Sequence, residues 1–398
     1  MRQITQTKTP SLISPPTLSA AMYFSFFMAL GAFMPFLNLY YERLGMTGIQ
    51  IGTLSAVPIL VASSTVLIWG SIADKKQWHR GILRISFLFG AVTILLLSTA
   101  NTFQMLLVYV VVYAFFTSPT VPLLDSAALE AGETSGRTYG ELRLWGSVGW
   151  SISAIFIGYV IQRLAIGWIF YCYIAIILLT LLLSFFQTKP IQTIQTSLRS
   201  GYKQLLYNRS FLLFLLSIFF ASLTLNAANA FFSIYLDAIG TSEGWIGIGW
   251  AIASMSEIPV MLFSGKLINR IGASGLLIIA FTAFAIRLFI FSFTATPALA
   301  LSLQLLSGLS FAFYLVGGVT YVKERTPEGL TTTGQSIYNL VGFGIGSIAG
   351  SLIGGYLYEV AGLNTLFRLL SVIALAALVA FLLSRPNRSP YTQATPPE

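Results

Sequence analysis

Residues 118–158 read SPTVPLLDSAALEAGETSGRTYGELRLWGSVGWSISAIFIG, two apolar segments joined by a short polar turn. Asp125 lies in the first segment and Arg143 in the second, each nine residues from Thr134. As two antiparallel helices with about 1.5 Å of rise per residue, the segments hold both charges about 13 Å from the turn. Trp150 follows Arg143 by seven residues and shares its helix face. Charges inside apolar helices are costly unless they face a cavity or each other, so the hairpin predicts a functional site.

The composition is that of a polytopic membrane protein. Of the 398 residues, 56% are hydrophobic and only 9% are charged, against about 25% charged in soluble proteins. The formal net charge of +9 is interpreted as a topology signal rather than as a surface for nucleic acid. The single cysteine, Cys172, excludes an internal disulfide and a cysteine-based metal site. The single histidine, His79, is interpreted as part of a basic loop, and no metal site is predicted.

Apolar segments near the spanning length of about 20 residues recur along the whole chain. They lie at residues 18–40, 49–71, 82–100, 103–128, 140–162, 166–187, 210–236, 244–265, 273–294, 298–321, 332–358 and 364–384. We therefore predict an all-α polytopic membrane protein with twelve transmembrane helices.

A polar, basic gap after the sixth segment divides the chain into two pseudo-symmetric six-helix bundles. The predicted domains are an N-terminal tail (1–17), a first bundle (18–187), a central linker (188–209), a second bundle (210–384) and a C-terminal tail (385–398). The halves resemble repeats, because Gly70-x-x-x-Asp74-Lys75 recurs 195 residues later as Gly265-x-x-x-Asn269-Arg270. A parallel six-plus-six repeat is the architecture of secondary transporters, whose site lies at the interface of the halves.

The lysines and arginines orient the chain. With both termini inside, 17 of the 22 fall in cytoplasmic segments, and only Arg43, Arg163 and Arg368 fall outside. The remaining two, Arg143 and Arg287, lie within apolar segments. This bias predicts a multi-pass protein of the inner (plasma) membrane with both termini in the cytoplasm.

Four ionisable residues stand out inside the apolar segments: Asp125, Arg143, Glu257 and Arg287. One interpretation is two structural ion pairs that hold helices together. We favour a transport pathway, because buried pairs stabilise poorly and intramembrane charge marks functional routes. Arg143 would then anchor an anionic or hydroxyl-rich ligand, and Asp125 would accept hydrogen bonds from ligand hydroxyls. Trp150 would stack on an apolar ligand face, and Glu257 would hold a proton.

A cytoplasmic cluster after the second segment is a candidate gating loop. Gly70, Asp74 and Lys75 either form a charge latch that is made in one conformation and broken in the other, or serve topology alone. The chain has no Walker A motif and no nucleophile–base pair, so we do not expect an enzyme. No cofactor is expected, and a proton gradient is the expected energy source.

These residues together resemble the major facilitator superfamily, in particular the branch that contains lactose permease and the phenylpropionate permease-like transporters. The likeness covers nearly the whole chain. It implies that Arg143, Gly146, Gly149 and Trp150 match the branch's sugar-site arginine, glycines and stacking tryptophan, with Asp125 in place of an essential glutamate.

Two further blocks carry the resemblance. Tyr139-Gly140-x-x-Arg143-Leu144-Trp145-Gly146-Ser147 is close to the phenylpropionate-type pattern. In the second half, Asn269-Arg270-Ile271-Gly272 and Arg287 match at the same mutual spacing. Glu257 resembles the sugar-site glutamate but lies three residues nearer to Asn269 than the branch has it.

The chain departs from the branch at the positions of its proton relay. The proton-coupling histidine and glutamate of helix ten fall at Ser307 and Ser310. Two aspartates of helix seven fall at Asn226 and Asn229, and the lysine partner of one falls at Gln304. Charges are lost on both sides, which avoids unpaired ions in lipid.

We therefore expect a transporter of a small organic solute, a sugar or an aromatic or organic acid, that works by alternating access. The expected substrate-binding residues are Asp125, Arg143, Trp150, Glu257, Arg287, Asn226 and Asn229. Proton symport through Glu257 or Asp125 is the first mechanism. The alternatives are a proton-independent facilitator, an efflux transporter of amphipathic compounds and a transporter-like receptor. The expected partners are the substrate and the lipid bilayer, without nucleic acid, and the chain is expected to be a monomer.

Overall fold

The computed structural model describes residues 14–187, 205, 207–327 and 329–385, and this part of the chain contains helices and no strand. The first helices are α1 (Pro15–Arg43), α2 (Gly48–Lys76), α3 (His79–Leu97), α4 (Phe103–Thr117), α5 (Thr120–Ser135), α6 (Tyr139–Arg163) and α7 (Trp168–Ser184). They are followed by α9 (Arg209–Ala238), α10 (Glu243–Leu262), α11 (Ser264–Phe291), α12 (Pro297–Arg325), α13 (Thr331–Asn339), the π-helix η1 (Leu340–Gly346) and α14 (Ser347–Ser384). The predicted tails and central linker lie largely outside these described residues.

Within the described ranges, ten helical stretches are long and apolar enough to cross a membrane. The last, Thr331–Ser384, has 54 residues, and at 1.5 Å per residue it is about 81 Å long, more than twice the hydrocarbon thickness. Gly362, with φ 73°, breaks this stretch, so that it supplies two crossings. α7 is an apolar helix of 17 residues, at the short end of the spanning range. The predicted all-α fold is confirmed, and counting α7 and both parts of the broken stretch gives the twelve predicted crossings among the described residues.

The described residues form two compact units, each of which is described by itself. The first contains residues 14–37 and 61–187. The second contains residues 38–60 together with 205, 207–327 and 329–385. Residues 38–60 are the C-terminal end of α1, the turn after it and the first part of α2.

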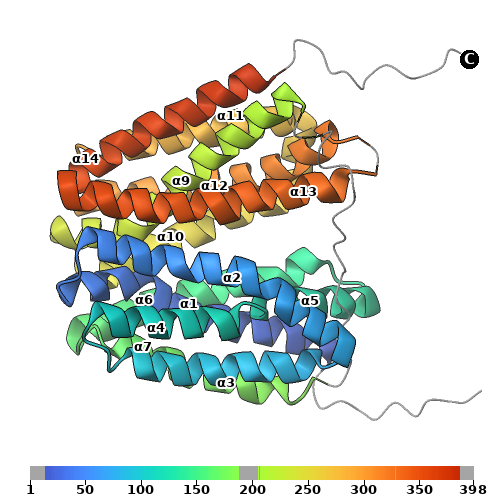
Figure 1. Ribbon diagram of the computed structural model, residues 1–398, viewed down its shortest axis with the longest axis vertical. Helices are drawn as coiled ribbons and strands as arrows, with labels where there is room; N and C mark the ends of the chain where they lie inside the picture. Colours follow the sequence, from blue (N-terminus) through green and yellow to red (C-terminus); the bar gives the residue numbers. More distant parts are fainter. Residues whose placement is uncertain (1–13, 188–204, 206, 328, 386–398) are drawn as a thin grey trace, which may run out of the picture. The chain divides into compact units, whose positions relative to one another are not determined.

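In the first unit, α3 packs between neighbours that come later in the chain. It contacts α4 and α7, and these helices run side by side in Figure 1. Close crossing of α1 and α6 depends on glycine: a Cβ at Gly149 would overlap the backbone of Phe24, and one at Gly31 would overlap the backbone of Trp150. These two glycines therefore fix how the Arg143 helix meets α1.

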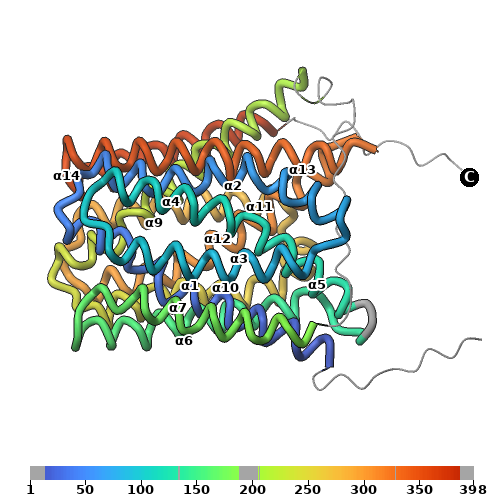
Figure 2. The backbone as a smooth tube through the Cα atoms, turned by 60° about the horizontal axis from the view of Figure 1, so that its bottom comes forward, coloured from blue at the N-terminus to red at the C-terminus, as the bar shows by residue number. Residues whose placement is uncertain are grey.

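In the second unit, α14 packs along α9, and α11 contacts both α12 and α14. Figure 2 shows α13, η1 and α14 as one continuous path. A row of glycines spaced four residues apart faces α9: Gly342, Gly346, Gly350 and Gly354. A Cβ at Gly350 would overlap the backbone carbonyl of Leu223, so the backbones of α9 and α14 approach each other closely here.

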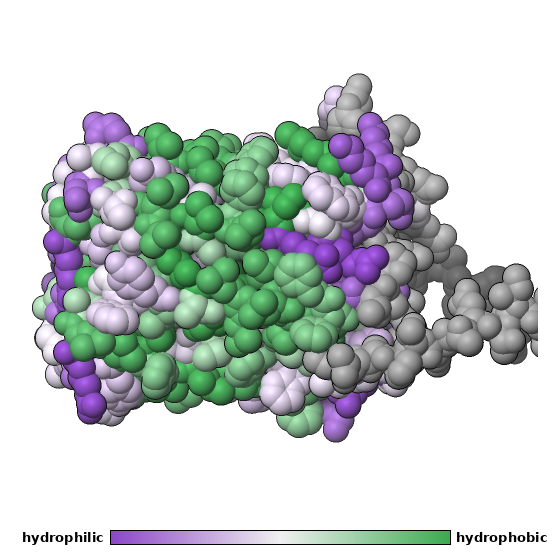
Figure 3. Space-filling view, turned by 90° about the horizontal axis from the view of Figure 1, so that it is seen from below, coloured by the Kyte–Doolittle hydropathy of each residue, from purple (hydrophilic) through white to green (hydrophobic). Residues whose placement is uncertain are grey.

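The side chains on the helix surfaces follow the predicted membrane placement. Figure 3 shows hydrophobic residues over the middle of the helices and hydrophilic residues gathered toward the helix ends. Exposed apolar side chains include Leu67, Phe156, Leu182 and Phe293. In water such a surface would be costly, whereas in a bilayer it faces lipid tails.

Candidate functional site

The predicted hairpin of residues 118–158 is formed by α5 and α6. α5 ends at Ser135 and is closed by Gly136 in the left-handed conformation (φ 71°). α6 begins after Thr138, whose Oγ1 accepts a hydrogen bond from the amide of Glu141 at 3.3 Å. Because only three residues connect them, α5 and α6 pack as neighbours, and they contact each other.

Asp125 is held by two phenol groups from different helices. The Tyr23 hydroxyl of α1 donates to Asp125 Oδ1, and the Tyr139 hydroxyl of α6 donates to the same oxygen at 3.0 Å. Asp125 Oδ2 accepts no hydrogen bond from the described residues. The carboxylate is half-buried, and among the described residues only one of its two oxygens is hydrogen-bonded.

Arg143 lies against aromatic faces rather than against a carboxylate. Its guanidinium carbon is 4.4 Å from the centroid of the Phe27 ring and 5.7 Å from that of Tyr23. The two rings are themselves stacked, with centroids 6.0 Å apart and planes 11° apart. In the described residues Arg143 makes no ion pair with Asp125, so the first of the two structural ion pairs considered above is not formed here.

Trp150 lies two turns along α6 from Arg143, as the spacing predicts, and is half-buried. Its backbone is the part that α1 approaches at Gly31. The first unit thus brings Asp125 and Arg143 together around Tyr23 and places Trp150 on the same helix as Arg143.

In the second unit, Arg287 is buried, with 2% of its surface exposed. Its Nη1 donates to Gln304 Oε1 at 3.5 Å, while its Nε has no hydrogen-bond partner among the described residues. The ion pairs of the described residues do not include Arg287. Gln304 therefore takes the place of the acidic partner that the second structural ion pair would need. Glu257 is half-buried on α10, two residues before Pro259.

The two asparagines of α9 differ in which of their amide atoms are hydrogen-bonded to the described residues. Asn226 uses its Nδ2 group to donate to Ser222 O at 3.0 Å and to Ser347 Oγ at 2.7 Å, which ties α9 to α14. Asn229 is exposed and makes no hydrogen bond with the described residues. Asn229 is thus the asparagine whose whole amide is available, whereas Asn226 has only its oxygen left.

The two serines at the relay positions are buried on α12. Ser310 Oγ donates to the carbonyl of Ser307 at 2.9 Å, a bond within the helix. Serine hydroxyls do not titrate at physiological pH. Any proton site in the described helices must therefore lie on other residues.

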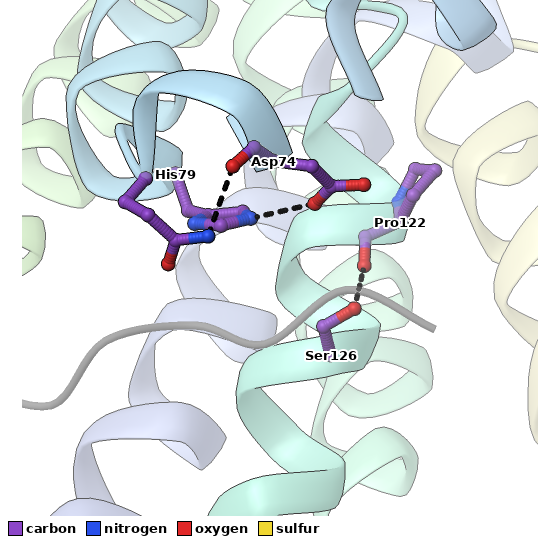
Figure 4. Close-up of polar contacts among 5 residues, drawn as sticks. Asp74, His79, Pro122 and Ser126 are labelled. Atoms are coloured by element: carbon purple, nitrogen blue, oxygen red, sulfur yellow. Dashed lines mark hydrogen bonds and ion pairs between the residues drawn. The ribbon is translucent and has the colours of Figure 1, made fainter. Parts of the chain in front are cut away.

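The candidate gating loop contains a pair that the sequence did not predict. His79 Nε2 lies 3.1 Å from Asp74 Oδ1, and Figure 4 shows the imidazole pointing at this carboxylate. His79 is the first residue of α3 and is buried, so its interpretation as part of a basic loop was wrong. Gln77, at φ 49°, makes the turn between Asp74 and His79, and its side chain donates to Asp74 O at 2.9 Å. Lys75 is exposed at the end of α2, and Gly70 lies five residues before it on the same helix.

The sequence analysis did not identify Tyr23 and Phe27 as part of the candidate site. It named Tyr139 but did not predict that its hydroxyl binds Asp125. The spacing of Tyr23 and Phe27, four residues apart on one helix face, is the signal that could have found them. Among the described residues no group of three histidine, cysteine or acidic side chains could hold a metal ion.

The sequence model of the MFS_1 like family matches residues 17–369. Maltose permease of Geobacillus stearothermophilus is 28% identical over 94% of this chain and 95% of its own. The "Probable 3-phenylpropionic acid transporter" of Escherichia coli (strain K12) is 26% identical over 89% of this chain and 94% of its own. The crystal structure of the nucleoside transporter NupG superposes with a TM-score of 0.84 at 17% identity, covering 94% of this chain and 99% of that one. The last likeness concerns the fold alone.

Proposed function

The chain belongs to the MFS_1 like family, and from this premise we propose that it is a proton-coupled uptake permease for a saccharide. Family membership and its permease relatives make it a multi-pass membrane transporter of small solutes and not an enzyme. We further propose that it lies in the inner membrane with both termini in the cytoplasm, and that it acts as a monomer without a cofactor.

One observation carries the substrate class: among the described residues, Asp125 has one oxygen without a hydrogen bond and Arg143 makes no hydrogen bond, and both contact Tyr23. A hydroxyl group both donates and accepts, so a sugar hydroxyl satisfies the carboxylate and neighbouring hydroxyls satisfy the guanidinium. Aromatic and indole faces nearby suit the apolar face of a sugar ring. Maltose permease, a relative over almost the whole chain, supports the same class.

The second substrate class is an aromatic acid, which the 3-phenylpropionic acid relative favours. Two features argue against it. Asp125 would repel a carboxylate placed on Arg143, and the other arginine considered as an anchor, Arg287, is buried against Gln304. A neutral, hydroxylated ligand meets neither obstacle.

Proton coupling rests on the carboxylates of the membrane helices. We propose Asp125 and Glu257 as the proton sites, since Ser307 and Ser310 replace the relay of the resembling branch. A proton-independent facilitator would differ from this proton-coupled permease only in that the proton gradient would not change the rate of uptake. An efflux transporter of amphipathic compounds would bind ligands with a large apolar surface, which make little use of the polar groups of Asp125 and Arg143.

A thermal-shift panel on purified full-length protein in detergent tests the substrate class, because a ligand that binds the folded state raises its Tm. Maltose and other disaccharides are compared with 3-phenylpropionate at equal concentrations. We expect saccharides to raise the Tm, and the rise to disappear in Asp125→Asn, which keeps the side-chain size. If only 3-phenylpropionate raises the Tm, and Arg143→Ala abolishes this rise, the substrate is an aromatic acid and the saccharide proposal is wrong.

A further inference from the structure

Two phenols that converge on one carboxylate oxygen are the feature that the proposed function leaves unexplained. Tyr23 comes from α1, Tyr139 from the first turn of α6, and Asp125 from α5, so three helices of the first unit meet at Oδ1. Neither tyrosine belongs to the charged set that the sequence singles out. Because both hydroxyls donate to the same oxygen of Asp125, we consider the two tyrosines together.

The two hydrogen bonds hold the plane of the Asp125 carboxylate in one orientation. With both donors on Oδ1, rotation of the group about its terminal bond would break two hydrogen bonds at once. Oδ2 is thereby held in one direction and stays free of hydrogen bonds from the described residues. A carboxylate with a single donor would be free to turn.

Tyr23 also acts on Arg143. Its ring stacks on Phe27, and the guanidinium lies over both rings, at 5.7 Å and 4.4 Å from their centroids. Cation–π attraction of this kind holds a guanidinium in place without using its N–H donors. Arg143 is therefore positioned by ring faces, while its N–H groups make no hydrogen bond with the described residues.

We infer that Tyr23 and Tyr139 are positioning residues that keep Asp125 and Arg143 from neutralising each other, so that both remain available for the ligand. On this inference, removal of the phenols would let the carboxylate of α5 and the guanidinium of the adjacent α6 close into an ion pair. A neutral ligand would then have to break that pair before it could bind. The inference deepens the proposed function and rests on it for the nature of the ligand.

The test begins with a measurement that needs no substrate. Phenylglyoxal modifies guanidinium groups that are free to react, and mass spectrometry of the peptide containing Arg143 gives the rate of its modification. The full-length protein in detergent is compared as wild type, as Tyr23→Phe/Tyr139→Phe, and as this double variant with Asp125→Asn added. Tyr159→Phe is the matched control, because Tyr159 is exposed on α6 and makes no hydrogen bond with the described residues.

We expect Arg143 to react in the wild type and in the control, and to react about tenfold more slowly in the double variant, where the ion pair forms. Adding Asp125→Asn removes the partner and restores the rate. Equal rates in all variants would overturn the inference, and so would slow modification that Asp125→Asn does not relieve. A tyrosine pair that merely supports the fold would lower the Tm without this pattern.

The second measurement is the maltose Kd of each single Tyr→Phe variant and of the same changes in the Asp125→Asn background. Loss of one hydrogen bond to a charged group predicts about a tenfold weaker Kd in the wild-type background. The same change has no further effect once Asp125 is absent. Unaltered affinity in both single variants contradicts the positioning role. If maltose does not bind even the wild type while the reactivity pattern holds, the proposed substrate fails and the positioning role stands.

Discussion

Arg43 and Asp237 form an ion pair of 2.7 Å that ties the end of α1 to the end of α9 within the second unit. The same guanidinium reaches Glu243, at the start of α10, at 2.9 Å. Residues 38–60 are held further by packing: a Cβ at Gly52 would overlap the carbonyl of Ser351 on α14. Charge and close helix contact together explain why this part of α1 and α2 groups with the second unit.

Both side chains of the Arg43–Asp237 pair are 33% exposed, which limits what the pair contributes. A double-mutant cycle with Arg43→Gln and Asp237→Asn should give a coupling of about 0.2–1 kcal/mol in the free energy of unfolding. Thermal or denaturant unfolding in detergent measures it, and the coupling should shrink as salt is raised. A coupling of several kcal/mol would show that solvent does not screen the pair.

The glycine row on α14 predicts a sharp contrast between two substitutions. Gly350→Ala places a methyl group against the Leu223 backbone and should cost about 1–3 kcal/mol of stability, because neither backbone can move aside. Gly344→Ala is the matched control, since its Cβ would meet only the end of the Leu340 side chain, at 3.6 Å. Measurement of both melting temperatures checks the contrast, and equal losses would refute the close contact of α9 and α14.

Gly146 leaves room for the guanidinium of Arg143. A Cβ there would lie 3.1 Å from Arg143 Nη1 and 2.9 Å from the Phe27 ring. Both neighbours are side chains that can shift, so Gly146→Ala should keep the fold but weaken maltose binding about tenfold. Gly140→Ala, whose nearest neighbour would be 4.0 Å away, should bind as the wild type does. Isothermal titration calorimetry measures the maltose Kd of both variants. Identical Kd values would show that Gly146 does not contribute to the binding site.

Gln304 supplies the polar partner of the buried Arg287. Replacing it in Gln304→Leu leaves a buried charge without that partner and should cost about 1–3 kcal/mol of stability. Adding Arg287→Met should recover most of the loss, because an apolar pair of similar size needs no hydrogen bond. Unfolding curves of the single and double variants provide the measurement. Failure of the second change to rescue the first would mean that Gln304 stabilises through other contacts.

Much of the fold can be predicted from hydropathy, because lipid forces each crossing to be a long apolar helix. The segments 273–294 and 364–384 begin just after Gly272 and Gly362, where the helices break with φ 69° and 73°. The predicted segment 103–128 is instead two helices that meet near Pro119, whose ring interrupts the helical hydrogen bonds. The π-helix Leu340–Gly346 had no signal in the pattern beyond its glycines.

The site was only partly predictable, for a physical reason. Charges inside apolar segments identify Asp125 and Arg143, since their cost in lipid demands a function. Their partners depend on how α1 crosses α6, which the close backbone contacts at Gly31 and Gly149 decide. Helix periodicity predicts which face of α1 carries Tyr23, but it does not predict which helix packs against that face. Sequence reasoning therefore anticipated an ion pair, or a ligand, where the structure places two phenols.

Uptake of radiolabelled maltose by proteoliposomes containing the full-length protein tests the central claim most directly. The wild type is measured with and without an inward proton gradient, beside Asp125→Asn. We predict that the gradient drives accumulation in the wild type and that Asp125→Asn abolishes it. Uptake no greater than that of empty liposomes would contradict the assignment of a saccharide, and uptake that ignores the gradient would contradict proton coupling.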